Sequence, residues 1–158
     1  MPHLPRRVGG AQAVRPGQGQ FAGPAASGRR IEIDGSPPRC PVEADPEAIS
    51  VALRNLVDNA IKYSPGHPTI WMEWAKENDC VAIRVRDQGP GVARSERKAI
   101  FRKFVRGSAA SAANVRGSGL GLAMVRHIVT AHRGAVTLAS QPGQGSTFTI
   151  LLPATERA

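Results

Sequence analysis

The chain has 158 residues, of which 41% are hydrophobic, and this is the size and apolar content of a single globular domain. No stretch approaches the roughly 18 to 20 consecutive apolar residues that cross a bilayer, and the N-terminus lacks the apolar segment of a secretory signal. We therefore expect a cytoplasmic chain that makes no membrane contact of its own. The two cysteines, Cys40 and Cys80, form no CxxC pair, which argues against a zinc site and a disulfide framework.

The net charge of +9 is unevenly distributed along the chain. Residues 1–30 contain five arginines and no acidic residue, and residues 94–116 contain seven basic residues opposed only by Glu96. A positive field confined to one internal segment suits a polyphosphate or an acidic partner protein better than a long duplex. The sequence thus disfavours nucleic acid as a partner, although a basic N-terminal tail that grips nucleic acid stays open as an alternative.

Composition divides the chain into three parts. Residues 1–29 are rich in Gly, Pro and Ala with few large apolar side chains, and they predict a flexible basic linker or tail. Residues 30–154 have the apolar patterning of a folded domain, and residues 155–158 form a short C-terminal tail. The first predicted strand lies in RIEIDG at 30–35, where Ile31 and Ile33 share one face, and it ends at Asp34 and Gly35.

A long helix follows this strand. Asp45 is a typical N-cap, Pro46 suits the first helical position, and the helix is predicted to run to about Tyr63. Asn55, Asn59 and Lys62 recur at helical spacing on a face separate from the apolar stripe. The alternative interpretation is that this is an ordinary solvated helix face. Two asparagines one turn apart would be an unusual pair for such a face.

The remaining elements mix strands and helices. They are strands at 69–77 and 80–88 joined by Asn78 and Asp79, a short helical stretch at 95–100, a helix at 120–132, and strands at 135–140 and 146–152. This order predicts an α/β (α+β) two-layer sandwich, in which a mixed, mostly antiparallel sheet is covered on one face by helices. The helix at 120–132 is expected to use Leu120 and Met124 in its apolar stripe.

Two local features point to ligand binding. Period-two alternation places Asp87 on the same inward face as Val81, Ile83 and Val85, and a carboxylate there needs a hydrogen-bonding reason. The glycines of 117–121 precede a helix, whose N-terminal N–H groups favour a phosphate. Taken alone, the glycines equally indicate a hinge, because they fit neither a Rossmann fingerprint nor a Walker loop.

Several blocks in a fixed order resemble one known family. They are NLVDNAIKY at 55–63, DQGPG at 87–91, Phe101 with Phe104, GSGLG at 117–121 and GQGSTF at 143–148. Together they resemble the ATP-binding catalytic domain of sensor histidine kinases, which belongs with the gyrase, Hsp90 and MutL ATPases. The resemblance covers about residues 30–153 and implies binding of ATP with Mg²⁺.

The resemblance also implies roles for particular residues. Asn59 matches the magnesium-binding position, and Asp87 matches the carboxylate that accepts a hydrogen bond from the adenine amino group. Phe101 and Phe104 are expected to pack in the apolar layer at the base of a mobile lid over 107–119. The full ATP-binding set that we predict is Asn55, Asn59, Lys62, Tyr63, Asp87, Gly89, Gly91, Arg106, Arg116, Gly117, Gly119, Leu120, Gly121 and Thr147.

What the sequence lacks also bears on the reaction. Asn55 stands where the gyrase-like ATPases carry a glutamate that activates water, and an amide cannot act as a base. The four histidines are followed by Leu4, Pro68, Ile128 and Arg133, none of which gives the acceptor pattern of a histidine before an acidic residue. We therefore expect poor ATP hydrolysis and no certain catalytic residue in this chain.

The resemblance implies transfer of the γ-phosphate to a histidine on a separate dimerisation domain, in cis or in trans. A response regulator would then act downstream, and whether the parent protein is anchored in a membrane stays open. One alternative is an anti-sigma-factor serine kinase of the same fold. Another is a nucleotide-binding regulatory module without transfer activity.

Overall fold

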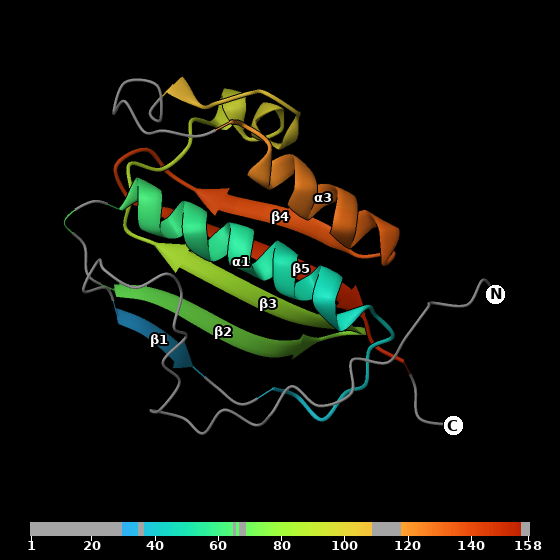
Figure 1. Ribbon diagram of the computed structural model, residues 1–158. Helices are drawn as coiled ribbons and strands as arrows, with labels where there is room; N and C mark the ends of the chain where they lie inside the picture. The colour runs from blue at the N-terminus through green and yellow to red at the C-terminus, as the bar shows by residue number, and fades with distance from the viewer. Residues whose placement is uncertain (1–29, 35–36, 65, 67–68, 109–117, 156–158) are drawn as a thin grey trace.

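The computed structural model describes residues 30–34, 37–64, 66, 69–108 and 118–155 (Figure 1). Its five strands are β1 (Arg30–Asp34), β2 (Thr69–Glu77), β3 (Cys80–Asp87), β4 (Ala135–Ser140) and β5 (Ser146–Pro153). They form one sheet in the order β1-β2-β3-β5-β4, in which β1 runs parallel to β2 and every other pairing is antiparallel. The predicted fold class is confirmed.

Two helices cover one face of this sheet. Helix α1 (Pro46–Tyr63) and helix α3 (Gly121–Ala131) lie side by side across the strands (Figure 1). Alternate strand residues point toward them, since the side chains of a strand alternate between its two faces. The resulting core contains, among others, Leu56, Ile70, Met72, Val85, Val125, Val129 and Ile150.

The start of α1 is fixed by a cap and by a histidine from far along the chain. Asp45 Oδ1 accepts hydrogen bonds from the backbone N–H of Glu47 at 2.9 Å and of Ala48 at 3.4 Å, as its N-cap role predicts. The Asp45 backbone N–H donates to Nε2 of His132, 3.0 Å away, and Nδ1 of His132 lies 2.7 Å from the Ile128 carbonyl oxygen. Nε2 must therefore be the unprotonated nitrogen and Nδ1 the donor, so this buried imidazole is neutral.

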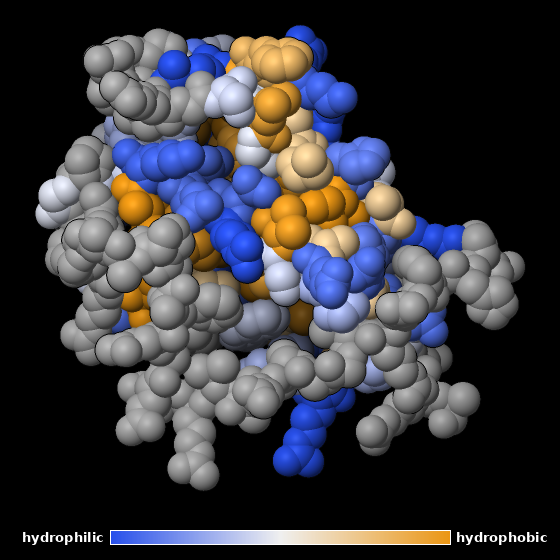
Figure 2. Space-filling view, in the orientation of Figure 1, coloured by the Kyte–Doolittle hydropathy of each residue, from blue (hydrophilic) through white to orange (hydrophobic). Residues whose placement is uncertain are grey.

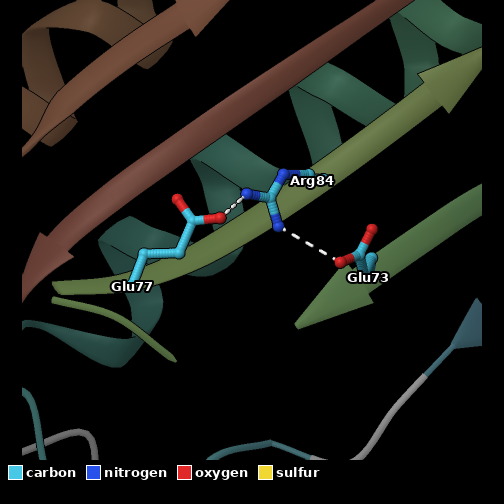
Figure 3. A network of polar contacts seen from close by, with 3 residues as sticks. All are labelled: Glu73, Glu77 and Arg84. Carbon is cyan, nitrogen blue, oxygen red and sulfur yellow. Dashed lines mark hydrogen bonds and ion pairs between the residues drawn. The ribbon is translucent and has the colours of Figure 1, made fainter. Parts of the chain in front are cut away.

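The second face of the sheet carries no helix in the described part of the chain. Figure 3 views it with α1 behind the strands, and Arg84 lies between Glu73 and Glu77. Arg84 pairs with Glu73 at 3.2 Å and also with Glu77. The sequence places these residues on the outward set of β2 and β3, and their charge agrees with that exposure.

Three apolar predictions were wrong in the region after β3. Phe101 is buried and meets Phe148 edge to face at 6.1 Å between ring centroids, but Phe104 is 73% exposed. Leu120 and Met124 are also exposed, and the residues that α3 buries are Ala123, Val125, Ile128 and Val129. The helical stretch predicted at 95–100 is two 3-10 turns, η1 (Arg94–Glu96) and η2 (Ala99–Phe101).

None of the helices in the described ranges has both the length and the apolar character that a bilayer span requires.

Candidate nucleotide-binding site

A polar hollow of about 180 Å³ lies between α1 and the N-terminus of α3. Asn55 and Asn59 approach it from α1: a Cβ placed on Gly121 would stand 3.2 Å from Oδ1 of Asn55 and 3.9 Å from Oδ1 of Asn59. The two amides thus face the first residue of α3, where free backbone N–H groups and the helix dipole favour an anion. The full lining is Asn55, Asp58, Asn59, Lys62, Tyr63, Ile100, Val105, Arg106, Gly107, Ser118, Gly119, Gly121 and Leu122.

The two asparagines differ in their side-chain hydrogen bonds. The amide nitrogen of Asn55 donates to the Val51 carbonyl at 3.0 Å, one turn earlier in the helix. Asn59 makes no side-chain hydrogen bond within the described ranges, so its amide oxygen is available to a ligand. Both lie on the helix face predicted from their four-residue spacing.

Asp87 ends β3 and is 6% exposed, and it is not itself among the residues that line this hollow. Its Oδ1 accepts from the backbone N–H of Gly89 at 2.8 Å and of Ser146 at 3.2 Å. Burial raises the pKa of Asp87 above its ordinary value, and the hydrogen bonds from Gly89 and Ser146 oppose that rise. Oδ2 makes no hydrogen bond within the described ranges and is free to accept one from a ligand.

Close backbone packing holds this carboxylate in place. A Cβ on Gly89 would lie 2.3 Å from the carbonyl oxygen of Tyr63, so the chain after Asp87 rests against the end of α1. Gly145 has φ +78°, and a Cβ there would lie 2.1 Å from the Asp87 carbonyl oxygen. No residue with a side chain fits at Gly145 without moving Asp87.

The prediction of Thr147 as an ATP-binding residue needs correction. In the sheet register Asp87 is opposite Ser146, whereas Thr147 is opposite Arg86 on the other face. Ser146 is therefore the residue beside Asp87. The alternation of Phe148, Ile150 and Leu152 toward the core already assigned odd-numbered positions of β5 to the outer face.

The other predicted residues differ in how they lie relative to the hollow. Those that line the hollow are Asn55, Asn59, Lys62, Tyr63, Arg106, Gly119 and Gly121. Asp87 and Gly89 do not line it, but Gly89 packs against the carbonyl oxygen of Tyr63, which does. Gly91 packs against Gln141 instead, and Leu120 is exposed and is not part of the lining. Arg116, Gly117 and most of the predicted lid lie outside the described residues.

Sequence reasoning missed part of the wall. The lining residues that it did not name are Asp58, Ile100, Val105, Ser118 and Leu122. Asp58 could have been found from its place next to Asn59, and Leu122 from its place after Gly121. Ile100 and Val105 are apolar side chains of the hollow's wall, so no polar residue type in the sequence marks them as part of the site.

Exposed apolar side chains border the same region. Among the residues that the structure describes, the large apolar ones with substantial exposure are Val51, Phe104, Leu120 and Met124. Figure 2 shows hydrophobic surface gathered where α1 and α3 meet. Phe104 has φ +64° and donates its backbone N–H to the Gly119 carbonyl at 3.0 Å, which turns its side chain outward. We call these four residues the apolar rim.

Comparison with known sequences gives matches over most of the described domain. Residues 44–156 match the family described as histidine kinase-, DNA gyrase B- and HSP90-like ATPases. The sensor-like histidine kinase SenX3 of Mycobacterium tuberculosis is 39% identical over 131 residues, which are 82% of this chain and 32% of that protein. The sensor histidine kinase CpxA of Escherichia coli is 37% identical over 131 residues, 83% of this chain and 28% of that one. The chain thus spans about a third or less of these relatives.

Solved structures agree with this match. The mycobacterial sensor histidine kinase MprB superposes with a TM-score of 0.68 and 30% identity, covering 83% of this chain and 85% of that one. Full-length ShkA in complex with AMPPNP gives a TM-score of 0.67 and 31% identity, covering 81% of this chain and 26% of that one. The second structure holds an ATP analogue.

Proposed function

The chain belongs to the histidine kinase-, DNA gyrase B- and HSP90-like ATPases, and we propose that it is the ATP-binding catalytic domain of a two-component sensor histidine kinase. In this function it binds ATP with Mg²⁺ and presents the γ-phosphate to a histidine on a dimerisation domain outside these residues. A response regulator then receives the phosphoryl group.

Two observations together carry the proposal: the turn after Asp87 packs through Gly89 against Tyr63 at the end of α1, and α1 brings Asn55 and Asn59 to the hollow. Oδ2 of Asp87 is an acceptor in a buried position, which suits the exocyclic amino group of adenine. At the other side, the N–H groups at the start of α3 and the cations Lys62 and Arg106 suit phosphates. A nucleotide is the common ligand that carries both groups.

The donor set also fits a nucleotide-bound magnesium ion. The described residues contain no cluster of three or more His, Cys, Asp or Glu side chains, so they offer no cage made by the protein alone. Mg²⁺ with nucleotides needs only one or two protein oxygens, because phosphates and water complete its octahedron. We assign Asn59 Oδ1 as the protein ligand, and the ion supplies neutralisation of phosphate charge when bound.

Transfer in this site relies on positioning and charge. Asn55 stands where a glutamate would activate water, and its amide cannot take a proton from water, which favours keeping ATP intact until an acceptor arrives. Lys62 and Arg106 are placed to stabilise the phosphate oxygens.

The apolar rim is our candidate contact for the dimerisation domain. It borders the phosphate end of the hollow, because Phe104 contacts Gly119 and because Leu120 lies between two glycines that line the hollow. An acceptor histidine must come within bonding distance of the γ-phosphate, so its helix has to rest on this edge. Its apolar surface suits an amphipathic helix.

The test is transfer of label from [γ-³²P]ATP to a separately purified dimerisation domain whose acceptor histidine precedes an acidic residue. We expect label that survives alkali and is lost in acid, and none when the acceptor histidine is replaced by alanine. Acid-stable label would instead support the serine kinase. Tight ATP binding without label on any histidine-bearing domain would support the regulatory module. The relatives described above are sensor histidine kinases, which disfavours both alternatives.

A variant of the rim separates docking from nucleotide binding. Met124 is 47% exposed and does not line the hollow, so Met124→Lys should reduce transfer about tenfold or more while ATP affinity stays unchanged. Arg126→Lys, on the same helix, is the matched control and should leave both unchanged. Equal transfer by wild type and Met124→Lys would remove the rim from the proposal.

A further inference from the structure

A buried hydroxyl group connects two backbone segments that flank Asp87. Ser140 ends β4, is 8% exposed, and is paired with Ser146 at the start of β5. Its Oγ accepts a hydrogen bond from the backbone N–H of Val92 at 2.8 Å and donates one to the Gly145 carbonyl at 2.9 Å. It also lies 2.9 Å from the Oγ of Ser146, which is buried as well. Ser140 thus joins the turn that follows β3 to the start of β5.

Each hydrogen atom around this hydroxyl group has a place. In the assignment that pairs every group, the single hydroxyl proton of Ser140 goes to the Gly145 carbonyl, which can only accept. Ser140 Oγ then accepts two hydrogen bonds, from the Val92 N–H and from the Ser146 hydroxyl. A serine hydroxyl offers one donor and two acceptor positions, so all three are used. A side chain without the hydroxyl would leave buried groups of both segments unpaired.

The segments that Ser140 joins are the ones that hold the Asp87 carboxylate. Oδ1 of Asp87 accepts from the Gly89 N–H in the turn and from the Ser146 N–H at the start of β5. The Ser140 hydroxyl bonds to Ser146 and to Val92, which follows Gly89 in the same turn. The relative position of the two donors to Oδ1, and with it the direction of Oδ2, therefore depends on Ser140.

Other contacts hold the same segments together without this side chain. The Gly143 N–H donates to the Pro90 carbonyl at 2.7 Å. A Cβ on Gly91 would lie 2.1 Å from the Gln141 carbonyl oxygen, so the two backbones pack directly against each other. We therefore expect the turn to stay against the connection between β4 and β5 when the Ser140 hydroxyl is removed. What changes is the finer position of the groups around Asp87.

We propose that Ser140 is a positioning residue for the nucleotide base, because its hydroxyl keeps the Asp87 carboxylate directed at the amino group of adenine. The inference rests on the proposed function, in which Oδ2 of Asp87 accepts a hydrogen bond from that amino group. Ser140 does not line the hollow between α1 and α3, so it acts through Asp87. A carboxylate oxygen favours a donor and repels a carbonyl oxygen at the same place, so its direction sets the preference for adenine.

The test compares ATP with inosine triphosphate, in which a carbonyl oxygen replaces the amino group of adenine. Both nucleotides are titrated with Mg²⁺ into wild type and Ser140→Ala by calorimetry. We expect wild type to prefer ATP by about tenfold or more. In Ser140→Ala the affinity for ATP should fall about three- to tenfold, while that for inosine triphosphate stays within about twofold. A merely structural role would lower both affinities alike.

Two further variants control for stability and folding. Thr155→Ala removes a side-chain hydrogen bond to the Pro41 carbonyl, 2.9 Å long, beyond the other end of β5. It should lower stability and leave the preference for ATP unchanged. Ser140→Cys fills the same volume with a weakly bonding thiol, so it should show the same reduced preference and carries the test if Ser140→Ala does not fold.

The outcomes separate this inference from the proposed function. Wild type that binds neither nucleotide, or both equally, would contradict the proposed function. Wild type that prefers ATP, with the same preference in the Ser140 variants, would contradict the positioning role alone. Equal losses for both nucleotides, or failure of both Ser140 variants to fold, would also overturn that role, because Ser140 would then serve the fold as a whole.

Discussion

The two ends of the α1 and α3 pair differ in how their polar groups are used. At one end, the Asp45 carboxylate caps α1 and its backbone N–H is taken by His132, whose other nitrogen bonds to Ile128. At the other end, Asn59, the start of α3 and Oδ2 of Asp87 have no such partners within the described ranges. The polar groups at the first end are paired with one another, whereas those at the second end gain partners only when a ligand binds.

This difference separates stability from function along one helix pair. Buried polar groups that are fully paired add to folding stability and fix the packing. Groups that are left open at a concave end cost some stability and gain it back on binding. Substitutions at the two ends should therefore affect different measurements.

The largest effect on folding is expected at the closed end. His132→Ala removes a buried imidazole and leaves the Asp45 N–H without its acceptor, so the free energy of unfolding should fall by about 3 kcal/mol. Chemical denaturation would measure it. His127→Ala, an exposed position of the same helix, should change stability by less than about 0.5 kcal/mol. If His132→Ala lost nucleotide affinity in its folded state, the two ends would not be separable.

At the open end, Asn59→Ala should act on the magnesium requirement. We expect the affinity for ATP with Mg²⁺ to fall about tenfold, with little change in the affinity measured in EDTA, because one metal ligand is removed. Asn55→Ala is the comparison, since its amide is already bonded to Val51 and should affect both conditions alike. Equal losses with and without Mg²⁺ in Asn59→Ala would contradict the assignment of this ligand.

Measuring folding stability as a function of pH tests how much the burial of the ionised Asp87 carboxylate destabilises the fold. Burial raises the pKa of Asp87 above its ordinary value of 3.8. The contribution of this carboxyl group to folding stability is therefore fully present below pH 3.8, and it is lost as the pH rises through the higher pKa of the folded state. The stability of wild type relative to Asp87→Asn should therefore increase as the pH falls from 7 toward 4. Denaturation curves of both proteins across that range would show it, and a difference independent of pH would count against it.

The smallest effect is expected on the outer face of the sheet. Arg84→Gln removes two ion pairs that are half exposed, so the free energy of unfolding should fall by less than about 1 kcal/mol. Thermal denaturation at low and high salt would measure it, and the difference from wild type should shrink in high salt. A decrease of several kcal/mol in the free energy of unfolding would contradict this account, because it would mean that the ion pairs of Arg84 are essential to folding stability.

Local signals in the sequence were sufficient for much of the fold and part of the site. Asp45 and Pro46 fixed the start of α1 through short-range backbone chemistry, and the four-residue spacing of Asn55 and Asn59 fixed their common face. The alternation in β3 placed Asp87 inward, as the structure confirms. Each of these depends only on residues within one element.

What failed depended on contacts between distant elements or on a backbone turn. Phe104 is exposed because its left-handed turn against Gly119 directs it outward, which hydrophobicity alone does not reveal. The contact of His132 with Asp45 joins residues 87 positions apart. The Thr147 error was avoidable, because the same alternation that placed Asp87 also assigns Ser146, and not Thr147, to its side of the sheet.

The most direct test of the nucleotide site is calorimetric titration of ATP, with and without Mg²⁺, into wild type and Asp87→Asn. The asparagine oxygen can still accept from Gly89 and Ser146, so the variant should stay folded while losing the acceptor at Oδ2. We predict magnesium-dependent binding by wild type that is weakened about ten- to a hundredfold in the variant, the usual cost of an unpaired buried group. No binding by folded wild type, or equal binding by both proteins, would contradict the assignment of this site to ATP.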